Sequence, residues 1–250
     1  MKYAFAGNRD IAYNILSYLI AEGYKPSALA ILDDSDLSTK LTEISGLKKK
    51  KIYKGKDFFA EETINDLKKM DLDYIFGIHY PLIIPKEILT IAKIGFINLH
   101  PAFLPYNRGW HPPSWAIINN TKYGATLHFM SEKLDMGDII HQIEIEISPD
   151  DTANKLYSRV LKLEEELFKK ALPDLLSLNP SRVPQDINLG DCHSKKDIKK
   201  IQQIELEQKV TYLEAIDKFR ALTTNDVNEA AYFIKDGRKF VIQVNITEIK

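Results

Sequence analysis

Asn98 and His100 are the residues whose types and spacing point most directly to catalysis. They lie two positions apart at the end of a predicted strand, Phe96–Leu99, so their side chains share one face. An amide can donate a hydrogen bond to a developing oxyanion, and an imidazole can exchange a proton near neutral pH. Taken alone, Asn-x-His is a weak motif, and the simpler alternative is an asparagine that caps the strand and an ordinary surface histidine. The pair therefore carries a functional prediction only together with further motifs.

The first half of the chain has the pattern of an α/β sheet that could hold such a pair. Short apolar runs alternate with apolar residues at helical spacing. The predicted strands are Tyr3–Ala6, Ala28–Leu32, Tyr74–Ile78 and Phe96–Leu99, and helices are predicted at 11–20, at 58–70 and after Pro85. Uninterrupted apolar strands are typical of a mostly parallel sheet with helices on both faces. Such a Rossmann-like sheet binds ligands beyond the carboxyl ends of its strands.

The second half predicts two more strands and a small C-terminal α+β piece. Strands are expected at Ala125–Met130 and Ile139–Ile147, and a long helix after Asp150 is expected to end near Pro173. A stretch from 177 to 184 with two prolines and no periodicity predicts a domain boundary. The predicted domains are a catalytic domain, 1–176, and a C-terminal domain, 185–250, with a helix at 212–222 and a final β-hairpin turning at Asp236-Gly237.

Composition excludes several classes of protein. The 250 residues carry 34 basic and 35 acidic side chains, a net charge of −1, so no overall positive field would bind a nucleic acid. A single cysteine, Cys192, excludes a disulfide framework, and the six histidines show no metal-ligand spacing, so no metal is predicted. The N-terminus does not resemble a signal peptide, and no run reaches about 18 apolar residues. We expect a cytoplasmic protein without a membrane partner.

The ordered motifs around Asn98 and His100 resemble the formyltransferases that use N10-formyltetrahydrofolate. These motifs are Asn98-Leu99-His100-Pro101, Leu104-Pro105, Arg108-Gly109 and Leu134-Asp135-Met136-Gly137-Asp138, and the resemblance covers roughly residues 1–175. It implies that Asn98, His100 and Asp135 form the catalytic constellation, with Asp135 in a loop after a strand that carries His128. It also implies a cis peptide bond between Leu104 and Pro105.

The run Trp110-His111-Pro112-Pro113-Ser114-Trp115 resembles the branch of this family that formylates amino sugars on nucleotide diphosphates. The segments His193–Asp197 and Phe219–Leu222 are similar to that branch as well. The implied acceptor is a dTDP-4-amino-4,6-dideoxyhexose, used in surface polysaccharide (O-antigen) synthesis. The candidate acceptor-binding residues are Arg9, His79, Arg108, Gly109, His111 and Trp115. Packing at a helix start is the alternative for His111 and Trp115.

The segment after the strand Tyr74–Ile78 occupies the position where the pterin of the folate donor binds in this family. Apolar walls with a few backbone polar groups suit a flat heteroaromatic ligand. The candidate donor-binding residues are Tyr80, Pro81, Leu82, Ile83, Ser131, Leu134 and Asp135. Ordinary packing at a helix entry is the alternative for the residues of the segment after Ile78, Tyr80 to Ile83.

Two other functions remain open. One is an enzyme like the methionyl-tRNA formyltransferases, although that branch has a larger, basic C-terminal domain. The other is a non-catalytic nucleotide-binding regulator with the same fold, which would have no reason to assemble Asn98, His100 and Asp135.

The C-terminal hairpin predicts how the chain assembles. Its strands carry apolar residues on both faces, and such a ribbon is unstable alone. We expect a homodimer with this hairpin at its centre. Folding of the hairpin onto its own domain is the alternative.

Overall fold

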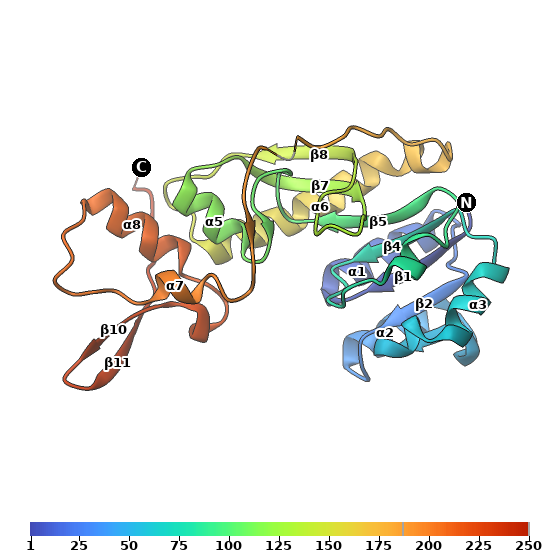
Figure 1. The fold of residues 1–250 in the computed structure, drawn as a ribbon, viewed down its shortest axis with the longest axis horizontal. Coiled ribbons are helices and arrows are strands. Elements are labelled where there is room, and N and C mark those ends of the chain that lie inside the picture. The colour runs from blue at the N-terminus through green and yellow to red at the C-terminus, as the bar shows by residue number, and fades with distance from the viewer. Residues whose placement is uncertain (187, 250) are drawn as a thin grey trace. The chain divides into compact units, whose positions relative to one another are not determined.

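The computed structural model describes residues 1–186 and 188–249, which form two compact units (Figure 1). Unit 1 comprises Met1–His100, Thr126–Gln142 and Glu164–Gln185, and unit 2 comprises Pro101–Ala125, Ile143–Leu163 and Asp186–Lys250. Unit 2 therefore also takes in two stretches that precede the domain boundary expected from the sequence. The boundary at 177–184 remains a prediction of where one independently folding domain ends and the next begins.

The central element is a seven-stranded sheet with the order β3-β2-β1-β4-β5-β7-β8. Its strands are β1 (Tyr3–Gly7), β2 (Ala28–Ile31), β3 (Ile52–Lys54), β4 (Tyr74–Ile78), β5 (Gly95–His100), β7 (Tyr123–Phe129) and β8 (Ile139–Ile145). The first five strands in this order pair in parallel, and β7 runs antiparallel to β5. The predicted mostly parallel sheet is confirmed.

Eight helices lie among the described residues. They are α1 (Arg9–Ala21), α2 (Asp36–Ser45), α3 (Glu61–Lys69), α4 (Lys86–Leu89), α5 (Pro112–Asn119), α6 (Ala153–Leu176), α7 (Lys199–Gln202) and α8 (Tyr212–Ala221), with short 3-10 turns at 49–51, 55–59 and 227–229. Helix α6 continues through Pro173 to Leu176, so the expected end near Pro173 was slightly too early.

Alternate residues of the central strands face opposite helical layers of unit 1. The Phe76 ring packs edge-on against Phe168 of α6 at 5.6 Å, and the Tyr74 hydroxyl donates to the carbonyl of Leu175 at 3.0 Å. Ile75, between them in sequence, packs with Leu67 of α3 in the opposite layer. Each such large side chain stabilises the fold by about 1.5–3 kcal/mol when buried. Helices therefore pack on both faces of the sheet at β4.

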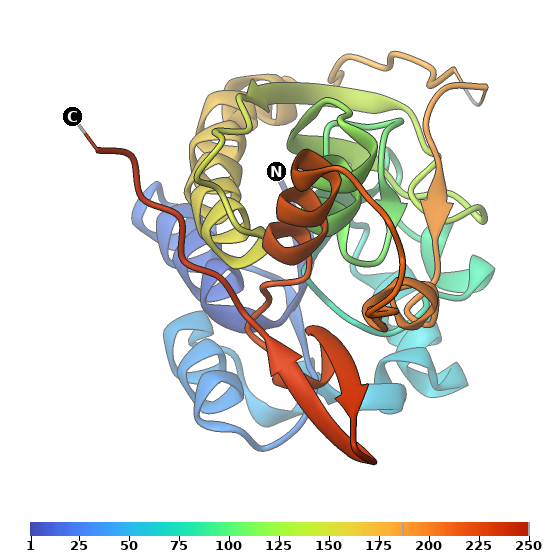
Figure 2. The ribbon, with the colours of Figure 1, turned by 90° about the vertical axis from the view of Figure 1, so that its left-hand side faces the viewer.

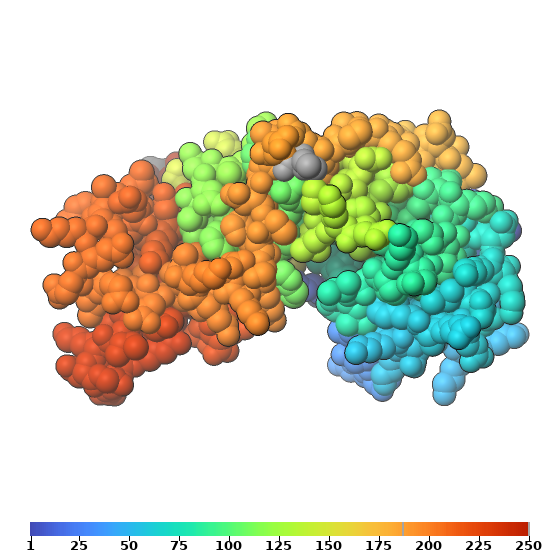
Figure 3. Space-filling model, viewed as in Figure 1, coloured from blue at the N-terminus to red at the C-terminus, as the bar shows by residue number. Residues whose placement is uncertain are grey.

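The last two strands of unit 2, β10 (Ala231–Lys235) and β11 (Arg238–Ile242), form a hairpin seen in red in Figures 2 and 3. The strands pair antiparallel, and Asp236 and Gly237 both have positive φ (51° and 71°), as a tight hairpin turn requires. Two-residue strands β6 (Arg108–Gly109) and β9 (Cys192–His193) pair in parallel.

The Leu104–Pro105 peptide bond is cis, as predicted. Among the described residues, no helix has the length and apolar character that crossing a membrane requires.

Candidate active site

Asn98 lies two residues before the carboxyl end of β5, between two partners fixed by strand register. It stands opposite Gly77 of β4 and opposite His128 of β7. A Cβ atom on Gly77 would approach the Phe96 ring to 2.6 Å, so only glycine fits beside the asparagine. On the other side, Asn98 Nδ2 lies 3.2 Å from His128 Nε2, a cross-strand hydrogen bond within unit 1.

His128 is buried with both ring nitrogens engaged. Its Nδ1 lies 2.8 Å from the carbonyl oxygen of Phe129, and the residue is 1% exposed. Burial lowers the pKa of this imidazole to about 4, because the attraction of Asp135 only partly offsets the cost of desolvating the charged ring. The ring is therefore neutral at pH 7.

Asp135 lies close to both histidines. One carboxylate oxygen is 3.6 Å from His100 Nε2 and the other is 3.8 Å from His128 Nε2. The Nε2 atom of His100 is buried and has no hydrogen-bond partner among the described residues. Such an atom is rare inside a folded protein and points to a bound water or substrate. The structure thus brings together the three predicted catalytic side chains in unit 1.

The loop that carries Asp135 is held by residues that no motif indicated. Asp135 itself has a positive φ of 51°. The side-chain amide of Gln185 donates to the carbonyl oxygens of Asp135 (3.0 Å) and Gly137 (2.7 Å). A Cβ atom on Gly137 would lie 1.8 Å from the carbonyl oxygen of Phe129, so the loop closes tightly onto the end of β7.

Gln185 reaches this loop through backbone pairing. Val183 exchanges two hydrogen bonds with Ile139 at the start of β8, at 2.8 and 2.9 Å. Because the pairing joins residues far apart in sequence, no spacing could have revealed it.

The predicted donor-binding residues belong to two segments of unit 1. Ile83 is 93% exposed and Leu134 is 55% exposed. Both large apolar side chains are therefore accessible to pack against the flat ring of a folate. Tyr80 is half-buried, its hydroxyl donates to Gly55 O at 3.1 Å, and burial raises its pKa to about 12. Pro81 and Ser131 are exposed and Leu82 is half-buried. An ion pair between Lys86 and Glu132 at 2.7 Å brings the two segments side by side.

Arg9 and His79, two predicted acceptor-binding residues, also belong to unit 1. Arg9 is exposed at the start of α1 with a φ of 66°. His79 Nε2 lies 3.0 Å from both carboxylate oxygens of Glu164, in a pair whose side chains are 6% and 0% exposed. Nε2 of His79 is therefore paired with Glu164 inside the fold.

Arg108 and Gly109 belong to unit 2. The Arg108 side chain is buried, Nη2 donates to Gly190 O at 3.4 Å, and Nε and Nη1 have no hydrogen-bond partner in the part of the chain that the structure describes. A buried guanidinium in this state suits an anionic ligand. Gly109 has a φ of 86°, and a Cβ atom there would lie 2.3 Å from His193 O.

His111 and Trp115 start α5 in the same unit. His111 Nδ1 lies 3.6 Å from Glu229, and burial lowers the pKa of the ring. Trp115 stacks on His193 at 3.9 Å and packs with Leu222 in a small apolar core. The packing role that the sequence left open for Trp115 accounts for its burial.

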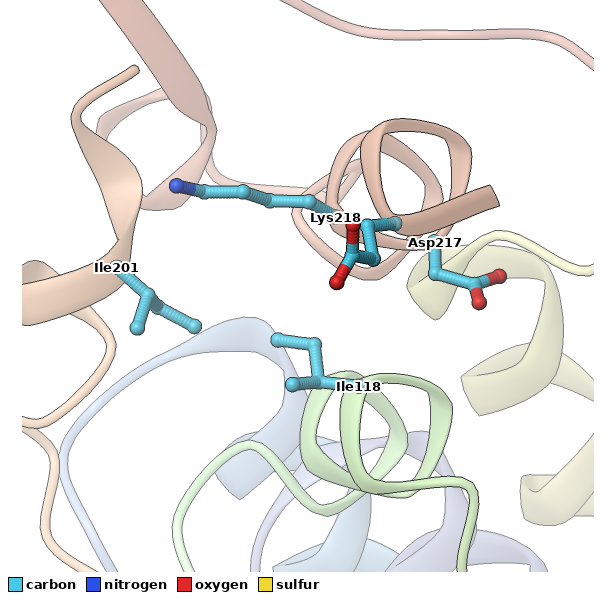
Figure 4. A pocket seen from close by; sticks show the side chains of 5 residues that line it. Ile118, Ile201, Asp217 and Lys218 are labelled. Carbon is cyan, nitrogen blue, oxygen red and sulfur yellow. The ribbon is translucent and has the colours of Figure 1, made fainter. Parts of the chain in front are cut away.

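A separate hollow lies in unit 2 between α5, α7 and α8 (Figure 4). It is lined by Ile118, Ile201, Glu214, Asp217 and Lys218. None of the predicted site residues lines it. Among the described residues, no group of three or more His, Cys, Asp or Glu side chains could hold a metal ion.

Comparison with known proteins finds two matching families. Residues 30–172 match the family described as formyl transferase. Residues 197–248 match the N-formyltransferase dimerization C-terminal domain.

Three relatives show how far the similarity extends. A dTDP-4-amino-4,6-dideoxyglucose formyltransferase from Mycobacterium tuberculosis is 30% identical over 185 residues, 74% of this chain and 77% of its own. The bifunctional polymyxin resistance protein ArnA of Wigglesworthia glossinidia brevipalpis is 36% identical over 199 residues, and the matched part is only 29% of that protein. The crystal structure of a 4-N formyltransferase from Francisella tularensis superposes with a TM-score of 0.83 at 30% identity, covering 99% of this chain and 98% of the other.

Proposed function

This chain belongs to the formyl transferase family, and we propose that it formylates the amine of a nucleotide-linked amino-deoxysugar. The formyl donor is N10-formyltetrahydrofolate, and the acceptor is of the dTDP-4-amino-4,6-dideoxyhexose type. The names of the Mycobacterium and Francisella relatives support an amine at the 4 position of the sugar.

One observation carries the proposal: Asn98, His100 and Asp135 meet at the carboxyl end of β5. His100 Nε2 is buried there without a hydrogen bond, 3.6 Å from Asp135. A buried polar atom without a hydrogen bond destabilises the fold, and a protein that only binds nucleotides would have no function that requires one. The exposed Ile83 and Leu134 support a folate ring nearby in the same unit.

Asn98, His100 and Asp135 have different roles in the proposed reaction. As the neutral amine forms its bond to the formyl carbon, the Asn98 amide donates to the oxygen on which negative charge develops. One such donor contributes about 3–4 kcal/mol to the transition state. His100 takes the proton from the attacking nitrogen and delivers it to N10 as the bond from the formyl carbon to N10 breaks. Asp135 favours the protonated ring during this transfer and orders a water beside it.

Arg108, Gly109 and His111 of unit 2 are proposed to bind the acceptor, with the buried Arg108 guanidinium on its diphosphate. The product is a formamido sugar nucleotide, the class of activated sugar that a glycosyltransferase consumes in surface polysaccharide synthesis. We propose a cytoplasmic location, because both highly charged substrates must meet the enzyme in the compartment that makes them.

We also propose a homodimer formed through the C-terminal hairpin. The match to a dimerization domain supports it. Ile234, Phe240 and Val241 of the hairpin are 51%, 41% and 42% exposed, and exposed apolar side chains on a ribbon with open edges are typical of an interaction surface.

The direct test supplies the full chain with N10-formyltetrahydrofolate and a dTDP-4-amino-4,6-dideoxyhexose. We expect release of tetrahydrofolate and a product heavier by one formyl group in the mass spectrum. The same sugar nucleotide with a hydroxyl in place of the amine is the control and should give neither. Transfer to methionyl-tRNA in preference to the sugar nucleotide would refute the proposal.

A further inference from the structure

His128 is the fourth polar side chain of the site, and the reaction as described leaves it without a role. It stands directly opposite Asn98 in neighbouring strands. Its ring is 1% exposed, with Nδ1 2.8 Å from Phe129 O and Nε2 3.2 Å from Asn98 Nδ2. A histidine packed only for bulk would not need both nitrogens matched in this way.

The two hydrogen bonds determine where the protons lie. A carbonyl oxygen can only accept, so Nδ1 of His128 carries the hydrogen that it donates to Phe129. The pKa of about 4, lowered by burial, keeps the ring neutral, so Nε2 carries a lone pair. That lone pair can only accept, and Asn98 must therefore turn its NH2 group toward the histidine. The reversed amide would place Oδ1 against the same lone pair.

We propose that His128 is a positioning residue for the reaction, acting through Asn98. By accepting one of the two amide hydrogens, it fixes the orientation of the side chain and leaves the second hydrogen to the formyl oxygen. The proposal rests on the formyl transfer proposed above. It assigns no proton transfer to His128 itself, because both of its nitrogens are already engaged.

Kinetics of three variants test this role. The amide oxygen of His128→Gln can accept from Asn98, whereas His128→Leu and His128→Met cannot. We expect kcat to fall roughly 10- to 100-fold in the Leu and Met variants, with both KM values within about twofold of wild type, since loss of one oxyanion donor costs about 100- to 1,000-fold. His128→Gln should keep kcat within about fivefold and leave the pH profile unchanged.

A double-mutant cycle separates positioning from a general structural role. Once Asn98→Ala has removed the amide, adding His128→Leu should lower kcat by no more than about twofold, because the two residues act as one unit. If the two losses multiply instead, His128 does not act through Asn98 and the proposal is wrong.

A measurement without turnover completes the test. The side-chain amide resonances of Asn98, identified by their loss in Asn98→Ala, should shift in His128→Leu and His128→Met and stay in place in His128→Gln. Unchanged resonances in both apolar variants would overturn the proposal. A wild-type chain that shows these shifts but formylates no amino-sugar nucleotide would instead overturn the proposed function.

Discussion

The Nε2 atom of His100 lies 3.6 Å from the Oδ2 atom of Asp135, with the two side chains only 10% and 8% exposed. This separation is longer than a hydrogen bond, so the imidazole nitrogen is available to a substrate or a water while the carboxylate stays beside it. We therefore expect both residues to be needed for turnover, for different reasons.

We expect His100→Asn and Asp135→Asn each to lower turnover by at least about a hundredfold, since positioned acid–base groups contribute roughly 100- to 10,000-fold. Both variants should remain folded, because an asparagine fills nearly the same space. Turnover under saturating substrates is the measurement, with circular dichroism as the check on folding. Near-normal turnover in either variant would remove that residue from the mechanism.

Stability should fall in acid because of His128. The ring has a pKa of about 4 when folded and 6.5 when free, so between these values the unfolded chain binds a proton that the folded chain does not. The contribution is complete above pH 6.5 and is lost as the pH falls toward 4, on the order of 3 kcal/mol over the window. Urea unfolding at pH 7 and pH 5 should show a smaller difference in His128→Gln than in wild type. Equal differences would contradict the neutral buried ring.

Ile83 should contribute to donor binding. We expect Ile83→Ser to raise the KM for N10-formyltetrahydrofolate about 5- to 10-fold, since burying a side chain of this size is worth about 1.5–3 kcal/mol and only part of that is lost. The thermal midpoint of the free protein should not change, because the side chain is 93% exposed. Ile249→Ser removes an isoleucine of equal exposure, 93%, and is the matched control. An unchanged KM for N10-formyltetrahydrofolate in Ile83→Ser would show that Ile83 does not contact the donor.

Arg108→Met should have opposite effects on the free and the bound protein. Without ligand, the variant should be at least as stable as wild type, because it removes a buried guanidinium with two unmatched nitrogens. The KM for the sugar nucleotide should rise at least about tenfold, since a charge-assisted contact is worth about 1.5–3 kcal/mol. Arg108→Lys should not restore binding, because a lysine cannot reproduce the planar fork. An unchanged KM for the sugar nucleotide in Arg108→Met would show that Arg108 does not bind the diphosphate.

Val241→Glu should shift the oligomeric state toward monomer. Val241 pairs with Tyr232 across the hairpin and is 42% exposed, so a carboxylate there would be buried in the proposed interface. Light scattering at tens of micromolar protein is the measurement. Leu178→Glu, which charges a leucine that is 43% exposed in unit 1, is the control and should leave the dimer intact. A wild-type monomer under these conditions would end the proposal.

Local patterns in the sequence predicted the strands that carry the site. Apolar runs indicated β4 at its observed bounds and β5 to within a residue at each end, because buried parallel strands have a composition of their own. Residue types and spacing indicated Asn98 and His100, whereas Asp135 came from a family resemblance. The strand register places His128 opposite Asn98, and the loop that follows this strand carries Asp135.

Long-range pairings could not be predicted in the same way. Glu164 lies on the apolar stripe of α6, and only the structure shows His79 as its partner. Gln185 follows a stretch without periodicity, and its contacts with the Asp135 loop depend on a backbone pairing 44 residues apart, between Val183 and Ile139.

The bracing of the catalytic loop by Gln185 limits how the protein can be shortened. A fragment trimmed at residue 176, where α6 ends, would contain the whole sheet together with Asn98, His100 and Asp135. It would lack the strand-like segment at Val183 and the amide that holds the carbonyl groups of Asp135 and Gly137. Anyone engineering a minimal catalytic fragment, or grafting this domain onto another protein, must therefore keep the chain at least to Gln185.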